Sequence, residues 1–279
     1  RGGKGVIAAT TKEDDFIEHV FVANTHNWLL FFTSDGRVLW KKVYKLPEGS
    51  RQARGKAIVN LLNLTLGTKI TACIPVKAFD PNHFLVMATE KGTVKKTSLE
   101  AYSRPRQGGS IAINLNGDDT LVKVLLTDGE QQLLLATQNG MAVKFKEKDV
   151  RAIGRTGMGV RGIRLRGDDI VISMVKASDT KKLLTITQNG FGKRTRVSDY
   201  RLISRGGSGV INIQTTERNG KVVAVRCVEE EDDIMFISRN GIIIRVPCAG
   251  ISTIGRNTQG LRLMRMKEGD TVVSAAKII

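Results

Sequence analysis

Short strand-like segments and polar turns alternate along the chain with a period of about fifty residues. In one clear unit, extended segments cover residues 183–187, 191–196, 210–214 and 222–228, separated by glycine-rich or polar stretches. Runs of this length bounded by turn residues indicate β-strands, and no amphipathic helical pattern is present. We therefore predict four short strands in each unit.

A glycine follows an apolar segment at five places, and each marks the turn of a predicted hairpin. These glycines are Gly36, Gly92, Gly140, Gly190 and Gly241, at intervals of 56, 48, 50 and 51 residues. Asp or Asn precedes four of them, and Lys91 precedes the remaining one. Asn-Gly and Asp-Gly between apolar runs favour type I′ hairpin turns. The sequence thus predicts five β-hairpins.

A second repeated feature is an arginine just before a glycine-rich anchor, with an apolar residue six positions after the anchor. The six arginines are Arg1, Arg54, Arg106, Arg155, Arg205 and Arg256. The strands predicted to close the units cover residues 16–22, 69–76, 120–126, 170–175, 222–228 and 271–276. Repeats of four strands per unit are typical of propellers. We predict a single all-β domain, residues 1–279, as a six-bladed propeller-like β-pinwheel with one blade completed by residues upstream of Arg1.

Composition limits the classes of function. The 44 Lys and Arg residues against 27 Asp and Glu give a net charge of +17, which implies a polyanionic partner. The three cysteines and three histidines show no metal-ligand or catalytic spacing, so we expect no metal, no cofactor and no catalytic residues in this chain. Apolar runs are far too short to span a membrane, and a reducing cytoplasm fits the cysteine usage.

Basic residues recur at equivalent places in the units, and they form the predicted DNA-binding rim. Residues two apart on a strand share a face, so each blade would present its cations at one position. The rim comprises Lys42, Arg51, Arg54, Lys56, Lys95, Lys96, Arg104, Arg106, Lys144, Lys146, Arg155, Arg161, Lys193, Arg194, Arg196, Arg205, Arg245 and Arg256. A solvated charged surface is the simpler alternative. With aromatic residues at only 5%, duplex DNA bent over the rim fits better than single strands stacked on aromatic rings.

The first glycine-rich loop, Arg1-Gly2-Gly3-Lys4-Gly5, combines two cations with three glycines. Glycines let backbone N–H groups approach a phosphate closely, while Arg and Lys supply charge. The other copies keep glycine but lose the lysine, except at Lys56. We interpret the first copy as a DNA-binding loop and the other copies as turns that build the blades.

These residues resemble a known family. Arg1 to Gly5 is similar to the end of the Q-R-R-G-G-K-G box of the DNA gyrase A protein, and further matches run through residues 53–56, 93–97 and 255–260. The resemblance covers essentially the whole chain and implies the C-terminal domain of that protein. It implies blades that exchange strands with their neighbours, duplex DNA wrapped around the basic edge, and a box, Arg1 to Gly5, that completes the wrap.

The same resemblance implies the wider setting. The partners would be double-stranded DNA, the rest of the gyrase A protein and the gyrase B protein, in an A2B2 assembly of the bacterial cytoplasm and nucleoid, with no membrane involved. ATP and Mg²⁺ would act elsewhere in the holoenzyme, which introduces negative supercoils. Two alternatives stay open at this point: the equivalent domain of topoisomerase IV, whose box is degenerate, and a propeller that binds an acidic protein.

Overall fold

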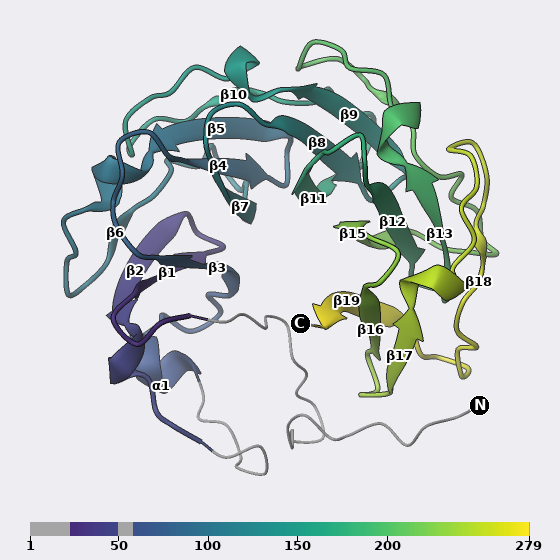
Figure 1. Cartoon of the computed structure of the whole chain (residues 1–279), viewed down its shortest axis with the longest axis horizontal. Helices are drawn as coiled ribbons and strands as arrows, with labels where there is room; N and C mark the ends of the chain where they lie inside the picture. The colour runs from purple at the N-terminus through teal and green to yellow at the C-terminus, as the bar shows by residue number, and fades with distance from the viewer. Residues whose placement is uncertain (1–22, 50–57, 279) are drawn as a thin grey trace.

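Five β-hairpins organise the computed structural model, which describes residues 23–49 and 58–278. Each belongs to one antiparallel sheet, or blade, and the blades follow one another around a common centre (Figure 1). Among the described residues, four blades have four strands with the hairpin in the middle, and the fifth has three strands with the second hairpin strand at its edge. The hairpins are β1 (Trp28–Thr33) with β2 (Arg37–Lys42), β4 (Phe84–Thr89) with β5 (Thr93–Ser98), β8 (Gln132–Thr137) with β9 (Met141–Lys146), β12 (Lys182–Thr187) with β13 (Phe191–Arg196), and β16 (Asp233–Ser238) with β17 (Ile243–Pro247). The five predicted hairpins are confirmed.

The turns themselves differ from the prediction. A type I′ turn needs positive φ at two successive residues, yet in each hairpin only the glycine has it, with φ between 81° and 90°. The glycine N–H donates to the carbonyl oxygen three residues earlier, as from Gly140 to Thr137 over 3.1 Å. Four of the connections are therefore three-residue loops that end in a left-handed glycine, a conformation that glycine adopts without a steric cost. The fifth connection, residues 239–242, has one further residue after its glycine.

The closing strand of each unit lies at the inner edge of its sheet. These strands are β3 (Ile70–Val76), β7 (Leu121–Thr127), β11 (Val171–Lys176), β15 (Val222–Val228) and β19 (Val272–Ile278), each paired with the first strand of its hairpin. Neighbouring inner strands contact one another around the centre (Figure 1). Their positions match the strands predicted for these five units.

The short third strand of a unit lies at the outer edge of the preceding blade. These outer strands are β6 (Ser110–Ile111), β10 (Val160–Arg161), β14 (Val210–Ile211) and β18 (Leu261–Arg262), which pair with β2, β5, β9 and β13. The segment predicted as a strand over 210–214 is thus only two residues long, and it completes a neighbouring sheet. The strand exchange implied by the resemblance is confirmed.

The described part of the chain forms a propeller of five blades, so the prediction of six is wrong. Each of the five hairpins makes one blade, and the first repeat, including the strand predicted over 16–22, lies outside the described residues. A further difference is the helix α1 (Ile58–Leu62), because the four-stranded repeat that follows Arg54 was predicted to have a strand there. Across residues 23–49 and 58–278, no helix has the length and hydrophobicity needed to cross a membrane.

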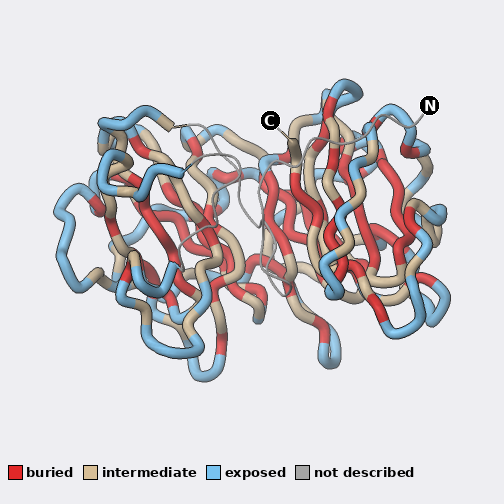
Figure 2. The backbone as a smooth tube through the Cα atoms, turned by 90° about the horizontal axis from the view of Figure 1, so that it is seen from below, coloured by how far each residue is buried: buried red, intermediate tan, exposed pale blue. Residues whose placement is uncertain are grey.

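The core consists of side chains packed between successive blades. Leu30, Phe32 and Trp40 of the first blade pack with Leu85 and Met87 of the second, and all five are buried. Figure 2 shows buried residues along the strands and exposed residues at the loops on both faces. Short 3-10 turns follow the second hairpin strands at η1 (Val43–Lys45), η2 (Leu99–Tyr102), η3 (Glu147–Asp149), η4 (Val197–Asp199) and η5 (Cys248–Gly250). From each of the last four turns, the chain crosses the outer edge to reach the next outer strand.

Candidate nucleic-acid interface

Two of the predicted rim lysines lie inside the protein. Lys95 is 1% exposed, and its ammonium group donates to the carbonyl oxygens of Ala112, over 2.5 Å, and of Arg155. Lys193 is fully buried and donates to the carbonyl oxygens of Gly255 and Arg256 over 2.7 and 2.6 Å. Burial, and then the charge of a nearby arginine, lowers the pKa of each lysine to about 7. Both lysines hold the loops that carry the next unit's arginine.

Three more of the repeated cations join one blade to the next. The side chains of Lys96, Lys144 and Arg194 are buried and donate to backbone carbonyls of the following blade, those of Glu147, Val197 and Ile251. Lys144 also pairs with Asp179 over 2.9 Å, and Arg194 pairs with Glu230 over 2.6 Å. The prediction that these three cations, together with Lys95 and Lys193, are exposed on the rim is wrong. All five are buried, so they are not part of the interface.

The arginines before the glycine anchors connect outer strands to neighbouring loops. Arg155, Arg205 and Arg256 donate from Nη1 to the carbonyl oxygens of Ile111, Arg161 and Ile211, over 3.0, 3.0 and 2.8 Å. Each acceptor belongs to the outer strand of the preceding unit. All three guanidinium groups remain partly exposed. These arginines hold the outer surface together while keeping positive charge on it.

The remaining residues of the predicted rim fall into three groups: exposed residues, residues with a partner in the same blade, and residues outside the described part of the chain. Arg104, Arg106, Lys146, Arg161 and Arg196 are exposed. Lys42 lies 4.3 Å from the ring centre of Trp28, and exposed Arg245 binds Asp233 over 2.9 Å. Arg1, Gly2, Gly3, Lys4, Gly5, Arg51, Arg54 and Lys56 lie outside the described residues, so their roles remain predictions.

Basic and acidic residues lie in different parts of the structure, a feature that the single sequence motifs did not reveal. We use "outer segments" for residues 101–117, 150–167, 200–216 and 248–267, each of which contains one outer strand. Together they carry thirteen Lys and Arg residues and no Asp or Glu. Beyond the predicted residues they supply Arg151, Arg164, Arg166, Arg201, Arg262, Arg265 and Lys267, all exposed. The absence of carboxylates from these stretches is a sequence signal that could have identified them.

Carboxylates lie at the ends of the outer segments or beyond them, where they have structural partners. Asp119 accepts hydrogen bonds from the backbone N–H groups of Lys91 and Thr120, and Asp169 does the same for Asn139 and Ile170. These aspartates fix the hairpin turns. Within the described residues, no cluster of His, Cys, Asp and Glu could hold a metal ion.

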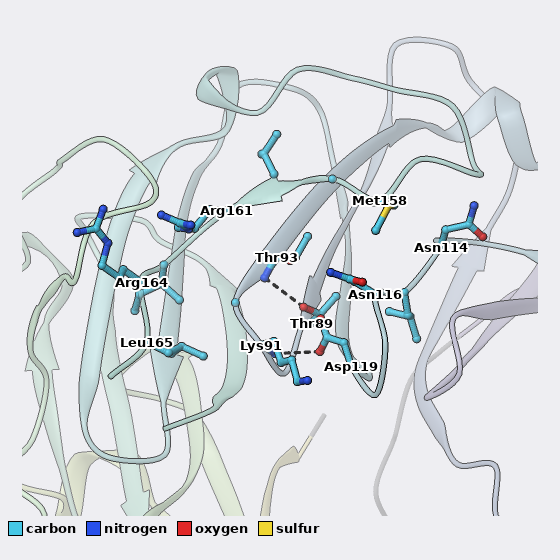
Figure 3. Close-up of a pocket in the computed structure, with 15 residues that line it drawn as sticks. Thr89, Lys91, Thr93, Asn114, Asn116, Asp119, Met158, Arg161, Arg164 and Leu165 are labelled. Carbon is cyan, nitrogen blue, oxygen red and sulfur yellow. Dashed lines mark hydrogen bonds between the residues drawn. The ribbon is translucent and has the colours of Figure 1, made fainter. Parts of the chain in front are cut away.

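A cavity of about 620 Å³ lies between two outer segments on the side of the hairpin turns. Figure 3 shows Arg161 and Arg164 from the 150–167 segment, and Asn114 and Asn116 from the 101–117 segment, around this cavity. The Lys91 side chain lies at its edge, and that lysine's backbone N–H binds Asp119 (Figure 3). The Lys91 ammonium group is paired with Asp118, so the guanidinium and amide groups at this recess are the suitable hydrogen-bond donors for a phosphate.

The comparison with known families decides the identity. The sequence model described as "DNA gyrase C-terminal domain, beta-propeller" matches residues 1–24, 27–77, 83–128, 131–178, 181–229 and 232–278. The chain belongs to the DNA gyrase C-terminal domain family. This gyrase domain is 50% identical over 278 residues to the DNA gyrase A protein of Salmonella typhimurium, covering 100% of the chain and 32% of that protein. With the DNA gyrase A protein of Clostridium acetobutylicum the identity is 49%, over 100% of the chain and 34% of that protein.

Solved structures show the same fold. The C-terminal domain of DNA topoisomerase IV superposes with a TM-score of 0.83 at 28% identity, covering 91% of this chain and 80% of that one. A solved DNA gyrase A C-terminal domain superposes with a TM-score of 0.79 at 22% identity, covering 98% and 92%. The sequence identities of 50% and 49% to the two gyrase A proteins above exceed the 28% to this topoisomerase IV domain, which favours gyrase over topoisomerase IV. The chain spans about a third of the length of these gyrase A relatives.

Proposed function

We propose that this gyrase domain binds duplex DNA along its outer segments and bends it around the edge of the propeller. The observation that carries the proposal is the presence of thirteen cations and no carboxylate in the four outer segments. A duplex laid along this edge would meet positive charge from one blade to the next. It would meet no negative side chain within the segments themselves.

The chemistry of the surface determines what kind of binding to expect. Arginine and lysine contacts to phosphates supply affinity that falls steeply with salt and does not depend on base sequence. Smooth bending of a 20–30 bp site by 40–90° costs about 1–6 kcal/mol, which further phosphate contacts along a curved edge can offset. The cavity beside Arg161 and Arg164 offers a place for one phosphate along this path. We expect selection among DNA sequences to follow their deformability.

For the whole enzyme we propose the role that the family resemblance implies. The domain would be the non-catalytic, DNA-wrapping part of a gyrase A protein that works with the gyrase B protein, while ATP and Mg²⁺ act elsewhere. The wrap would allow the holoenzyme to introduce negative supercoils. We propose that the box, Arg1 to Gly5, completes the wrap. Neutralising Arg1 and Lys4 should then abolish supercoiling by the reconstituted enzyme and leave simple DNA binding largely intact, and unchanged supercoiling would contradict this role.

The test of DNA bending uses a duplex of about 150 bp, one persistence length, with a fluorophore at each end. Addition of the domain should bring the ends together and raise energy transfer. The logarithm of the affinity should fall linearly with the logarithm of the salt concentration, at about 0.9 per neutralised phosphate. A duplex that stays straight, or an affinity insensitive to salt, would rule the proposal out.

A pair of charge-matched variants locates the interface. The outer variant is Arg151→Gln, Arg164→Gln, Arg166→Gln and Arg265→Gln combined. The control variant is Lys69→Gln, Lys77→Gln, Lys148→Gln and Lys221→Gln combined, four exposed lysines outside the outer segments. Both remove four charges, but only the outer variant should lose bending and show a smaller salt slope. Equal losses in the two variants would mean that net charge alone, and no particular surface, attracts the DNA.

A further inference from the structure

A second cavity lies at the centre of the propeller, at the opposite edge of the sheets from the outer segments. It measures about 360 Å³ and is lined by all five inner strands. Thr71 of β3, Lys123 of β7, Met174 of β11, Arg226 of β15 and Ala275 of β19 each contribute to it. Because every blade contributes one strand, the cavity exists only when the propeller is assembled.

Four cations line this cavity, and two of them have partners: Lys176 donates to the carbonyl oxygen of Leu126, and Lys181 pairs with Glu229. The other two, Lys123 and Arg226, have no counter-charge among the described residues. Lys123 comes from the second blade and Arg226 from the fourth. None of the described residues that line the cavity is an Asp or Glu, and most are apolar or small. Burial, followed by the charge of Arg226, lowers the pKa of Lys123 to about 8. At neutral pH Lys123 and Arg226 are therefore two positive groups without a counter-charge, and they repel each other.

The hydrogen-bonding capacity of these two groups is mostly unused. The Lys123 ammonium group makes no hydrogen bond or ion pair with any residue that the structure describes. Arg226 donates from Nε to the carbonyl oxygen of Ala275 over 2.6 Å, and its two terminal nitrogens have no such acceptor among the described residues. Both side chains are half-buried. A charged group that is partly withdrawn from water without a partner carries a cost, which a ligand with acceptor atoms can offset.

We propose that the central cavity binds a small oxyanion, such as inorganic phosphate, between Lys123 and Arg226. The anion would accept hydrogen bonds from the ammonium group and from the free nitrogens of the guanidinium group, and it would remove the repulsion between them. The cavity is suited to a phosphate-sized ion and its water, and it is far too small for duplex DNA. This site goes beyond the proposed DNA binding and is independent of it.

The test compares thermal unfolding of the chain in sodium phosphate with unfolding in sodium chloride of equal ionic strength. Phosphate should raise the melting temperature of the wild-type protein by about 3 °C at ten times its dissociation constant. Lys123→Met should abolish this increase, and Lys69→Met, at an exposed lysine, should retain it. In chloride, Lys123→Met should melt at or above the wild-type temperature, because it removes an unpaired charge near Arg226. A lower melting temperature in chloride, or an undiminished phosphate effect, would overturn the proposal.

Two further variants keep the result interpretable. Lys123→Arg retains a cation in the cavity and should keep a phosphate effect, which distinguishes loss of an anion site from damage to packing. The outer variant described above should also keep the effect, since its substitutions are remote from the cavity. If the outer variant loses the phosphate effect, phosphate acts on the outer segments and the central site is refuted, whether or not DNA bending is observed.

Discussion

Arg256 donates from Nη1 to the carbonyl oxygen of Ile211 over 2.8 Å, and so attaches its own loop to the outer strand β14. Its Nε donates to the carbonyl oxygen of Asp199 in η4 over 2.9 Å. Arg205 makes the same two contacts one unit earlier, with Asp149 and Arg161. A single guanidinium group therefore joins two backbone segments at the outer edge, and the contact repeats from blade to blade.

This geometry predicts that an arginine-to-lysine change at position 205 is not conservative. Lysine keeps the charge but lacks the planar set of donors that reaches both carbonyl groups. We expect Arg205→Lys to lower the free energy of unfolding by about 1 kcal/mol, and to leave the salt slope of DNA binding unchanged. Urea unfolding followed by circular dichroism measures the first effect. Arg201→Lys, at an exposed arginine nearby, is the control, and equal stability of the two variants would contradict a structural role for Arg205.

The hairpin glycines predict a second effect on stability, because one of them lies against an exchanged segment. Gly140 has a φ of 89°, and a Cβ added there would lie 2.1 Å from the carbonyl oxygen of Ile213. We expect Gly140→Ala to cost about 3 kcal/mol, since both the left-handed backbone and the contact are strained. Gly167 has a φ of 58° and open space around its Cβ position, so Gly167→Ala should cost only about 1 kcal/mol. If urea unfolding shows the same loss of free energy for both variants, the segment around Ile213 can accommodate a side chain at position 140.

Stability should depend on pH through Lys193. Burial, and then the charge of Arg256, lowers its pKa from 10.5 to about 7. Between these values the unfolded chain binds a proton that the folded chain has released, so the free energy of unfolding contributed by this group rises with pH. Below about pH 7 both states are protonated and the contribution is constant.

The measurement compares the wild-type protein with Lys193→Met in urea unfolding at pH 7 and pH 9. The difference in unfolding free energy between the two proteins should change in favour of the wild-type protein at the higher pH. Lys69→Met, at an exposed lysine, should show no such change relative to the wild type. Parallel pH profiles for wild type and Lys193→Met would mean that Lys193 does not titrate in this range.

Much of the fold could be predicted because its signals are local. The glycine after an apolar run identified every hairpin of the described chain, and residues 222–228 were predicted with the bounds that β15 has. Outer strands are different, because β14 is held by pairing with β9, about seventy residues earlier. A two-residue strand has too little sequence to show a period of its own. The predicted number of blades was wrong because each of the six sequence repeats was counted as one blade. The described residues contain five hairpins and five blades, and the first repeat lies outside them.

The site was harder to predict for a related reason. Lys96, Lys144 and Arg194 recur in register, and such a column of charges on half-exposed strands suggests an outer face. In the folded protein the next blade covers these positions, and each cation donates to a carbonyl of that blade. The regular spacing of these cations in the sequence cannot show whether they bind a ligand in each blade or hold neighbouring blades together. The absence of acidic residues from the outer segments is more informative, because structural ion pairs need carboxylates and a phosphate surface excludes them.

Two lysines on β9 allow the structural and surface roles of basic residues to be separated within one strand. Lys144 is buried between Asp179 and the carbonyl oxygen of Val197, whereas Lys146 is exposed. Lys144→Met breaks the ion pair with Asp179 and removes one of two donors to the carbonyl oxygen of Val197, which keeps the Tyr200 N–H, so we expect it to lower the free energy of unfolding by about 2 kcal/mol. Lys146→Met should change it by less than about 0.5 kcal/mol.

Both variants remove one positive charge from the same strand, so a general effect of charge on DNA binding would be the same for both. At a urea concentration where both are folded, we expect Lys144→Met to retain the wild-type salt slope for duplex binding, because its ammonium group does not reach the surface. If Lys146 contacts a phosphate, Lys146→Met should reduce that slope by about 0.9. A reduced slope for Lys144→Met with unchanged stability would place that lysine at the interface and contradict its role as a link between blades.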